Sequence, residues 1–339
     1  MNVGMYYHNS DVRLEQQPLP TVGEGDVLIK VVAGGICGSD LMEWYRMKRA
    51  PLVLGHELTG EIVETGKNVR QWKKGDRVFA THHVPCDECL YCLTGHSTAC
   101  VVFQEMNNFA PGGFAEFLRV TGRSVATGML KLPDSMSYET GTFIEPLATV
   151  VRAYRTIHLT PGDSVVIYGS GLAGILFVKL ARALGAGTVI VCDINDYRLT
   201  MAKKAGADFV VSANADVPAF VARHTGRLAD KAIICTGAIP AAEAALRSVD
   251  RGGTVLFFAV GKPGETMAID FNPYWRNDIS FKTCYGAAPL DNRQAMELLR
   301  TGAVAVDDMI THRYPLAEIG AAFKTAAEPT GTLKVIVVP

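Results

Sequence analysis

The chain has 339 residues, about twice the length of a typical domain, so we expect two domains. Hydrophobic residues make up 48% and charged residues 20%, which excludes a disordered or coiled-coil chain. The 33 basic and 34 acidic residues leave a net charge of −1, which argues against nucleic acid or an anionic membrane surface as the main partner.

The first part of the chain, from about residue 25 to 125, favours short β-strands. Four runs have β-type composition and are separated by glycine-containing turns, at residues 27–32, 60–64, 77–80 and 114–118. Short strands with such turns predict a compact, barrel-like β domain.

Two turn-flanked segments of this domain carry potential metal ligands: Gly35-Ile36-Cys37-Gly38-Ser39-Asp40 and Gly55-His56-Glu57. A lone cysteine or histidine is usually structural. Together with Glu145, in Ile144-Glu145-Pro146-Leu147, they supply a thiolate, an imidazole and carboxylates, which suit a zinc ion with one exchangeable position. Such a site can bind and acidify an alcohol for hydride transfer. We hypothesise that Ser39 accepts the alcohol proton and that Asp40 orients the imidazole.

Four of the eight cysteines lie within fifteen residues: Cys86, Cys89, Cys92 and Cys100. A tight cluster in a long chain without a secretion signal indicates metal binding rather than disulfides, and we expect a soluble cytoplasmic protein. Four thiolates complete a tetrahedral shell, which predicts one structural zinc. An iron–sulfur cluster is the less favoured alternative, because the lobe lacks a Cys-Pro ending. We expect the neighbouring His82, His83 and His96 to be solvated or hydrogen-bonded rather than ligands.

From about residue 145 onward, helical and strand patterns alternate. The expected helices span residues 147–157, 172–184, 196–205, 216–225 and 240–249, and the expected strands span 165–168, 188–192, 209–211, 232–235 and 255–258. This alternation predicts a doubly wound parallel sheet with helices on both faces.

The segment Gly169-Ser170-Gly171-Leu172-Ala173-Gly174 follows a buried strand and opens a helix, the context of a dinucleotide-binding turn. The glycines allow the tight turn, the approach of a pyrophosphate and close helix–strand packing. Asp193, nineteen residues past Gly174, can bind both ribose hydroxyls and repel a 2′-phosphate, so NAD is predicted over NADP. Arg198 lessens that preference. The alternative, that the glycines merely join strand to helix, is disfavoured by Asp193.

The last part of the chain has helical patterns at residues 293–301 and 316–327 and a strand pattern at 333–338. It is too small to fold alone, so we expect it to rejoin the first domain. The predicted division is a catalytic domain of residues 1–149, completed by 286–339, and a dinucleotide-binding domain of residues 150–285.

These motifs, with Gly75-Asp76-Arg77-Val78 and Thr311-His312-Arg313-Tyr314-Pro315-Leu316, run in the order of a known family and cover nearly the whole chain. The chain resembles the zinc-dependent medium-chain dehydrogenase/reductase superfamily, and within it the sorbitol (polyol) and threonine dehydrogenase branch. The resemblance implies a GroES-like domain interrupted by a Rossmann domain, and a homodimer or homotetramer. Counting the open site and the four-cysteine lobe predicts two zinc ions per chain. The resemblance also implies that Cys37 and His56 bind the catalytic zinc, with Glu57, Glu145 or each in different states as the carboxylate ligand.

Two departures from this family pattern concern the substrate side. Met42 stands where many relatives have a proton-relaying histidine, and the segment 41–49 is short and unusual. Its Arg46, Lys48 and Arg49 either meet an anionic substrate such as a sugar phosphate or form a solvated turn, and the general exposure of such residues favours the turn.

The leading hypothesis is an NAD-dependent zinc dehydrogenase that oxidises a secondary alcohol of a polyol, sugar, cyclitol or amino-alcohol. One alternative is an aldehyde or simple-alcohol reductase of the same fold. Another is a non-catalytic protein that binds NAD and zinc, against which the intact Cys37, Ser39, His56 and Glu145 argue.

Overall fold

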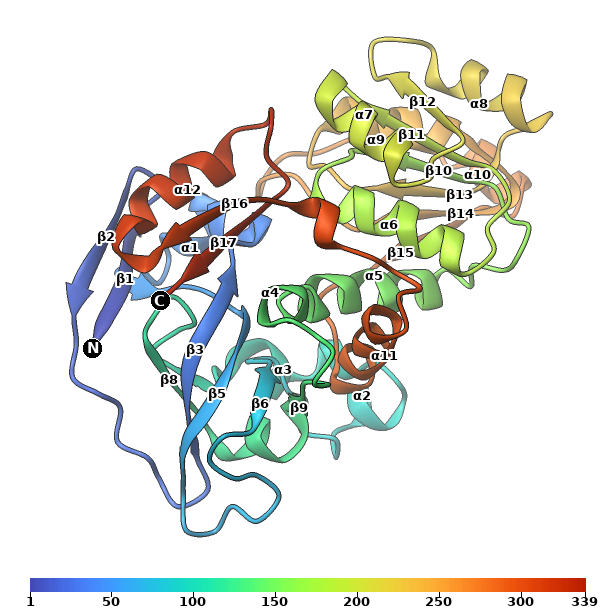
Figure 1. Cartoon of the computed structure of the whole chain (residues 1–339). Helices are drawn as coiled ribbons and strands as arrows, with labels where there is room; N and C mark the ends of the chain where they lie inside the picture. The colour runs from blue at the N-terminus through green and yellow to red at the C-terminus, as the bar shows by residue number, and fades with distance from the viewer. The chain divides into compact units, whose positions relative to one another are not determined.

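The computed structural model describes all 339 residues and divides them into two compact units. Unit 1 consists of residues 1–148 and 286–339, and unit 2 of residues 149–285. In Figure 1 the chain leaves unit 1 along α5 (Ile144–Thr156) and returns to it at the orange and red end of the colour scale. No helix is both long enough and apolar enough to cross a bilayer.

Unit 2 is built on one six-stranded sheet in which every neighbouring pair of strands is parallel. Its spatial order is β12 (Phe209–Ser212), β11 (Val189–Asp193), β10 (Val165–Tyr168), β13 (Ala229–Ile234), β14 (Val249–Phe257) and β15 (Ser280–Thr283). Numbered within the unit, this is the strand order 3-2-1-4-5-6 of a doubly wound dinucleotide-binding sheet. The order in which successive strands are added reverses between β10 and β13, although all strands stay parallel. The predicted parallel sheet is confirmed.

The helices of unit 2 alternate with its strands: α6 (Leu172–Ala183), α7 (Asp196–Lys204), α8 (Val217–Thr225), α9 (Ile239–Arg247) and α10 (Asn272–Arg276). Every residue of β10 and β11 is buried, which is why these strands are continuous apolar runs in the sequence. Strand β15 was not anticipated, because Phe281 is its only apolar residue and the other three side chains are exposed.

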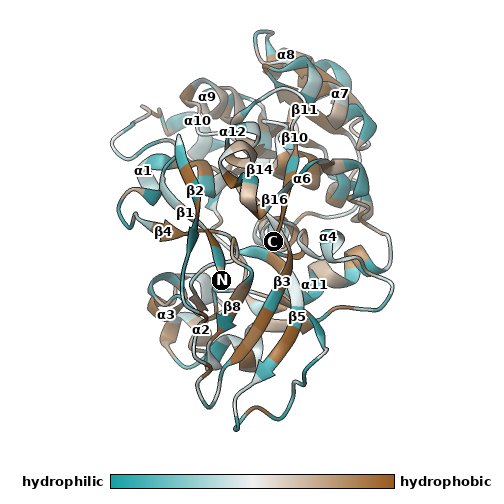
Figure 2. Ribbon diagram, turned by 60° about the vertical axis from the view of Figure 1, so that its left-hand side comes forward, coloured by the Kyte–Doolittle hydropathy of each residue, from teal (hydrophilic) through white to brown (hydrophobic).

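Unit 1 contains a mixed, mostly antiparallel sheet of eight strands. Its main path is β16 (Ile310–Pro315), β17 (Lys334–Val338), β3 (Val27–Gly35), β5 (Glu57–Thr65), β6 (Arg77–Ala80) and β9 (Met129–Lys131), with β8 (Phe117–Val120) paired to β3 and β7 (Phe109–Ala110) paired to β8. A second sheet has three strands, β2 (Asp11–Gln16), β1 (Asn2–His8) and β4 (Leu52–Val53). Figure 2 shows the apolar stretches along β3 and β5 that form part of this core.

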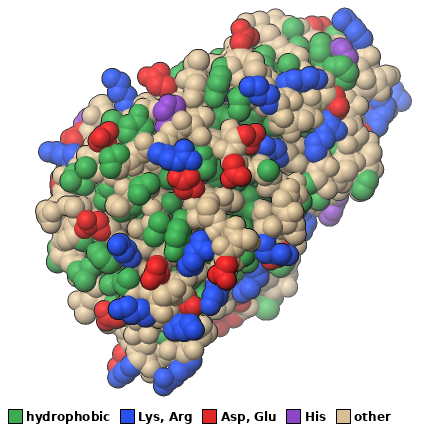
Figure 3. Space-filling model, viewed as in Figure 1, with side chains coloured by type: hydrophobic (Ala, Val, Ile, Leu, Met, Phe, Trp, Pro, Cys, Tyr) green, Lys and Arg blue, Asp and Glu red, His purple; other side chains and the backbone are tan.

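The helices of unit 1 are short apart from the last two: α1 (Glu43–Arg46), α2 (Leu90–Leu93), α3 (Val101–Glu105), α4 (Tyr138–Gly141), α11 (Pro289–Arg300) and α12 (Ile319–Ala327). Strand β8 begins at Phe117, later than expected, because the backbone N–H of Phe114 bonds to Leu54 O at 2.9 Å rather than to a neighbour in the large sheet. On the face seen in Figure 3, basic and acidic side chains are interspersed.

Strand β17 joins the end of the chain to the middle of this sheet. Ile336 pairs with Gly35 across the antiparallel β17–β3 ladder. A Cβ atom on Gly35 would lie 2.3 Å from the Lys334 Cε atom, so a larger residue here would displace the Lys334 side chain. The last strand thereby brings Lys334 beside the segment that contains Cys37.

Candidate functional site

The predicted open metal site lies at the paired ends of β3 and β5 in unit 1. Gly35, the last residue of β3, pairs directly with Glu57, the first residue of β5. This register places Cys37 next to His56 and Glu57, although the two segments are some twenty residues apart in the sequence. One donor atom each from Cys37, His56 and Glu57 lies within 4.8 Å of the others. This set of sulfur, nitrogen and oxygen donors fits one zinc ion.

Glu57 also forms an ion pair with Lys334, and both side chains are fully buried. Its Oε2 atom accepts a hydrogen bond from the Lys334 ammonium group, whereas its Oε1 atom is buried without a hydrogen-bond partner. A buried carboxylate oxygen without a partner is costly, and a metal ion is one partner that satisfies it. Burial lowers the pKa of Lys334 to about 8, and the negative charges of Cys37 and Asp40 oppose that shift.

Lys334 was missed by the sequence reasoning. The available signal was a single charged residue within the apolar strand Leu333-Lys334-Val335-Ile336-Val337-Val338. A lysine buried among such residues is almost always paired. Its partner is 277 positions away, so the pattern alone does not identify Glu57.

Asp40 and Ser39 surround the thiol and the imidazole. The Asp40 Oδ1 atom lies 3.5 Å from His56 Nδ1, and its Oδ2 atom accepts the Cys37 backbone N–H at 3.1 Å. The Ser39 hydroxyl lies 3.3 Å from the Cys37 sulfur. The geometry therefore agrees with the expected orienting contact of Asp40 on the imidazole and puts the Ser39 hydroxyl at the donor set.

The charges of this cluster support one another despite burial. Burial alone raises the pKa of the Cys37 thiol, but the charge and hydrogen bond of His56 outweigh it and lower that pKa. Burial likewise opposes the charged form of His56, yet Asp40 and Cys37 raise the His56 pKa well above its ordinary value. A stabilised thiolate at Cys37 is the form that binds a metal ion.

Glu145 occupies a different position from Glu57. It lies in the first turn of α5 and is buried, and burial raises the pKa of its carboxyl group while His56 lowers it and Asp40 raises it further. Its carboxylate is not among the three donors that lie within 4.8 Å of one another. Of the two predicted carboxylates, Glu57 belongs to the donor set. Glu145 lies outside it, but its negative charge opposes the lowering of the pKa of the Cys37 thiol.

The four-cysteine lobe is also brought together. The Sγ atoms of Cys86, Cys89, Cys92 and Cys100 all lie within 4.8 Å of one another, and no cysteine of the chain forms a disulfide. Backbone N–H groups of Cys86 and Cys89 point at the sulfurs of Cys100 and Cys86, at 3.4 and 3.3 Å. Four sulfur donors with backbone N–H support fit a closed tetrahedral zinc site.

Of the two histidines after β6, His82 contacts the open site and His83 contacts α3. The His83 Nδ1 atom bonds to Phe103 O at 2.8 Å, and its ring stacks on the Phe103 ring with centroids 4.7 Å apart. The His82 ring lies between His83 and His56, with centroids 3.7 and 5.2 Å away. Burial lowers the pKa of His82 well below its ordinary value. Sequence reasoning had not connected His82 with His56, because β6 and the start of β5 meet only through sheet pairing.

In unit 2 the glycine fingerprint has the backbone that a dinucleotide needs. Gly169 has φ +99°, and a Cβ on Gly174 would lie 2.0 Å from Gly169 O, so both positions require glycine. Around Gly171, which precedes the first turn of α6, a Cβ would meet nothing within 4 Å. This open N-terminus, continued by Leu172 and Ala173, fits a pyrophosphate.

Asp193 ends β11 beside this turn. Its Oδ2 atom accepts the backbone N–H and the hydroxyl of Ser170, at 2.6 and 3.0 Å, and its Oδ1 atom accepts the Asn195 N–H at 2.9 Å. These bonds fix the carboxylate where a ribose is expected. The Nε atom of Arg198, on α7, is buried without a hydrogen-bond partner.

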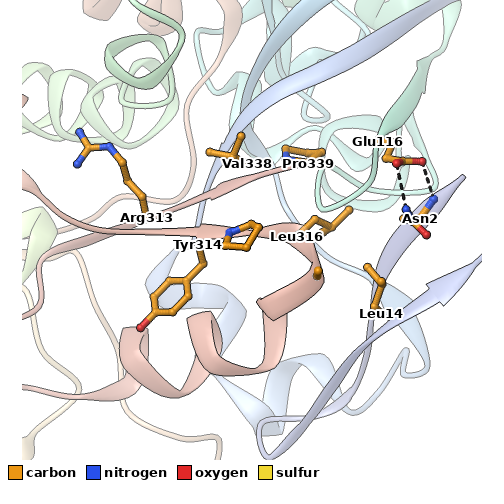
Figure 4. Close-up of a pocket in the computed structure, with 10 residues that line it drawn as sticks. Asn2, Leu14, Glu116, Arg313, Tyr314, Leu316, Val338 and Pro339 are labelled. Atoms are coloured by element: carbon orange, nitrogen blue, oxygen red, sulfur yellow. Dashed lines mark hydrogen bonds between the residues drawn. The ribbon is translucent and has the colours of Figure 1, made fainter.

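A separate hollow of about 470 Å³ lies in unit 1 where β1, β16 and the chain end meet (Figure 4). Its apolar wall includes Leu14, Leu316 and Val338, and Asn2 bonds to Glu116 at its rim. None of its lining residues belongs to either donor cluster. We therefore assign this hollow no part in the chemistry.

Comparisons with known proteins agree with this geometry. Residues 23–134 match the family model of the alcohol dehydrogenase GroES-like domain, and residues 173–301 match that of zinc-binding dehydrogenases. Sorbitol dehydrogenase of Mus musculus is 31% identical over 350 residues, which cover 99% of this chain and 95% of that protein. D-arabitol-phosphate dehydrogenase of Enterococcus avium is 34% identical over 319 residues, which cover 91% and 89%.

Among solved structures, a protein of Sinorhizobium meliloti 1021 named as a zinc-binding dehydrogenase and bound to NADP aligns with a TM-score of 0.90. It is 28% identical, and the alignment covers 100% of this chain and 99% of that one. The full-length identity and the two matched domains show that this chain belongs to the zinc-dependent medium-chain dehydrogenase/reductase superfamily, a group of oxidoreductases that use zinc and a nicotinamide dinucleotide on small molecules.

Proposed function

We propose that the protein is an NAD-dependent zinc dehydrogenase that oxidises a secondary hydroxyl of a polyol or a related sugar, cyclitol or amino-alcohol. The observation that carries the proposal is the convergence of Cys37, His56 and Glu57 within 4.8 Å of one another. The similarity to sorbitol and D-arabitol-phosphate dehydrogenases supports a polyol substrate class.

In this proposal Cys37, His56 and Glu57 hold the catalytic zinc and leave one position for the substrate. A bound zinc ion supplies a Lewis acid for the hydroxyl group, and a bound nicotinamide supplies the hydride acceptor. Asp40 holds the His56 ring through the 3.5 Å contact with Nδ1. We assign the Ser39 hydroxyl to relay the proton that the substrate hydroxyl loses: it would accept that proton and pass its own hydrogen on to water or to the coenzyme ribose, because Met42 stands where many relatives have a relaying histidine. Glu145, buried near His56, is the alternative carboxylate ligand, which would replace Glu57 in a different state of the site.

We further propose that NAD is preferred over NADP. The fixed Asp193 carboxylate supports this preference, because it repels a 2′-phosphate and can bind ribose hydroxyls. Arg198 and the NADP-bound relative argue for a modest rather than an absolute preference. The ratio of kcat/KM for the two coenzymes measures it directly.

Three proposals concern the whole protein. The four-sulfur lobe supports a second, structural zinc, so metal analysis should return about two zinc ions per chain. Eight cysteines without a disulfide support a reducing, cytoplasmic location. Family membership supports a homodimer or homotetramer, which light scattering of the purified protein distinguishes from a monomer.

The experiment that tests the function is NAD reduction, followed by absorbance, with a panel of polyols, polyol phosphates, inositols, threonine and simple alcohols. Activity on polyols supports the proposal, and activity confined to simple alcohols or aldehydes supports the reductase alternative. Binding of NAD and zinc with no turnover on any substrate supports a non-catalytic protein.

The Cys37→Ala variant connects that activity to the metal site. We expect it to fold, to bind NAD, and to lose one zinc per chain with nearly all turnover. The matched control is Cys284→Ala, which removes a cysteine that lies in neither donor cluster. Turnover above a few per cent of wild type in Cys37→Ala would contradict the assignment of the open site.

A further inference from the structure

Arg46 is the one basic residue of segment 41–49 whose side chain is mostly buried. It ends α1, the single helical turn that follows the 3-10 helix Gly38–Leu41. Only 17% of its side chain is exposed, and the Tyr45 ring covers its guanidinium at 4.9 Å. Lys48 and Arg49 are exposed. The sequence favoured a solvated turn for all three residues, and this is wrong for Arg46.

The Arg46 guanidinium makes three hydrogen bonds to the residues beside Cys37. Its Nε atom donates to Ser39 O at 2.9 Å, and its Nη2 atom donates to Ser39 Oγ at 2.8 Å and to Asp40 Oδ1 at 3.1 Å. The planar, forked guanidinium is suited to hold several acceptors at once, and it does not lose its proton in proteins. Arg46 therefore cannot take part in proton transfer, but it can fix the position of the groups that do.

Asp40 Oδ1 lies between two positively polarised groups. It is 3.1 Å from the Arg46 Nη2 atom and 3.5 Å from His56 Nδ1, and the Asp40 side chain is fully buried. The contact with Arg46 thus restricts the position of the carboxylate that orients His56. On the other side, the bond to Ser39 Oγ leaves the Ser39 hydrogen to point toward the Cys37 sulfur, 3.3 Å away.

No other side chain on this segment takes over these contacts. Met42, where the family resemblance expects a histidine, offers Ser39 only a backbone N–H at 3.4 Å. Glu43, the acidic neighbour, accepts the backbone N–H of Asn9 instead. The Asn9 side chain in turn bonds to Leu41 O at 2.8 Å, so the segment is attached to the β1–β2 turn at two points.

We propose that Arg46 is a positioning residue of the open metal site, which fixes the Ser39 hydroxyl directly and the His56 ring through Asp40. This inference rests on the proposed function, since it assigns Ser39 and His56 their roles in the reaction. Arg46 is then engaged by the protein and is not the group that binds a substrate anion.

The test compares Arg46→Met and Arg46→Lys with the control Arg49→Met, which removes an exposed cation three residues away. Loss of an outer contact to a metal ligand typically lowers activity or metal affinity by about 10- to 100-fold. We expect Arg46→Met to lower kcat by that factor while KM changes by less than about threefold. We also expect zinc release to a chelator to be at least about tenfold faster than in wild type. Arg46→Lys should recover part of both losses, because an ammonium group can make one of the three contacts.

Arg49→Met should stay within about twofold of wild type in kcat and zinc release. The proposal is overturned if Arg46→Met matches Arg49→Met in both readouts, or if it raises KM for a phosphorylated polyol at unchanged kcat, which would make Arg46 a substrate-binding residue. If Arg46→Met does not fold, Arg46→Lys and Arg46→Gln decide, and wild-type zinc release in both overturns the proposal. Because zinc release needs no substrate, a wild-type protein without polyol activity would refute the proposed function and leave this test intact.

Discussion

Replacing Lys334 with methionine tests the buried ion pair between Lys334 and Glu57 beside the proposed open metal site. The substitution keeps an unbranched side chain of similar length but removes the ammonium group. Both partners are fully buried, so Glu57 would retain a negative charge with no positive partner, and its Oε1 atom already lacks a hydrogen bond. Removing one member of a buried ion pair typically costs about 3–5 kcal/mol of folding free energy.

The cost translates into a large change in melting temperature. Unit 1 has 202 residues, and for a domain of that size each kcal/mol shifts the melting temperature by roughly 2–4 °C. Lys334→Met should therefore lower the unfolding transition of unit 1 by about 6–20 °C. The decrease should be larger after chelation, because a zinc ion bound as proposed would give Glu57 a replacement partner.

The assay is differential scanning calorimetry of the zinc-loaded and the chelated protein, with Lys131→Met as the control. Lys131 pairs with Asp76 at 2.7 Å in the same unit. The Lys131 side chain is 61% exposed, and Asp76, although buried, also accepts the Lys73 backbone N–H, so removing this ammonium should cost less than removing that of Lys334. The double variant Glu57→Met/Lys334→Met should melt closer to wild type than Lys334→Met does, since no lone charge remains buried. If Lys334→Met and Lys131→Met melted at the same temperature, the account of the buried pair would be refuted.

Three other predictions concern the rest of the molecule. Cys92→Ser should remove one zinc per chain and lower the melting temperature before it affects kcat; an unchanged melting curve and zinc content would argue against the lobe. Asp193→Ala should weaken NAD binding and reduce the discrimination against NADP, as measured by kcat/KM for both coenzymes; no change in either would remove Asp193 from the ribose. Burial lowers the pKa of His83 to about 4, so its neutral ring stabilises the fold above pH ~6.5, and stability should fall as the pH decreases from ~6.5 to ~4. His83→Asn should flatten that part of the curve of melting temperature against pH, and an identical slope would show that other groups cause it.

Much of the fold was predictable because its signals are local. Strands β10 and β11 are buried on both faces and are therefore continuous apolar runs, and the glycine fingerprint marks the turn between β10 and α6. Strand β15 was not predictable, since three of its four side chains are exposed and its pairing with β14 supplies what its sequence lacks.

The candidate site was predictable in its residue types and less so in its arrangement. The residues Cys37 and His56 stand out because each lies in a short glycine-flanked segment, and the four lobe cysteines because they lie close together in the sequence. Neither pattern distinguishes Glu57 from Glu145. The register of β3 against β5 does so, because it pairs Gly35 with Glu57 and so puts that carboxylate in the donor set.

The amino-acid sequence by itself determined which donors are available, the dinucleotide-binding turn and the alternation of strands and helices, because these depend on neighbours a few residues apart. Tertiary structure alone decided that Lys334 meets Glu57, that His82 packs against His56 and that Arg46 turns inward to Ser39 and Asp40. These contacts depend on strand register and on the return of the last strand to the first domain. A buried charge is costly unless it is paired, and its partner can come from any part of the chain that the fold places beside it, so the local sequence does not identify that partner.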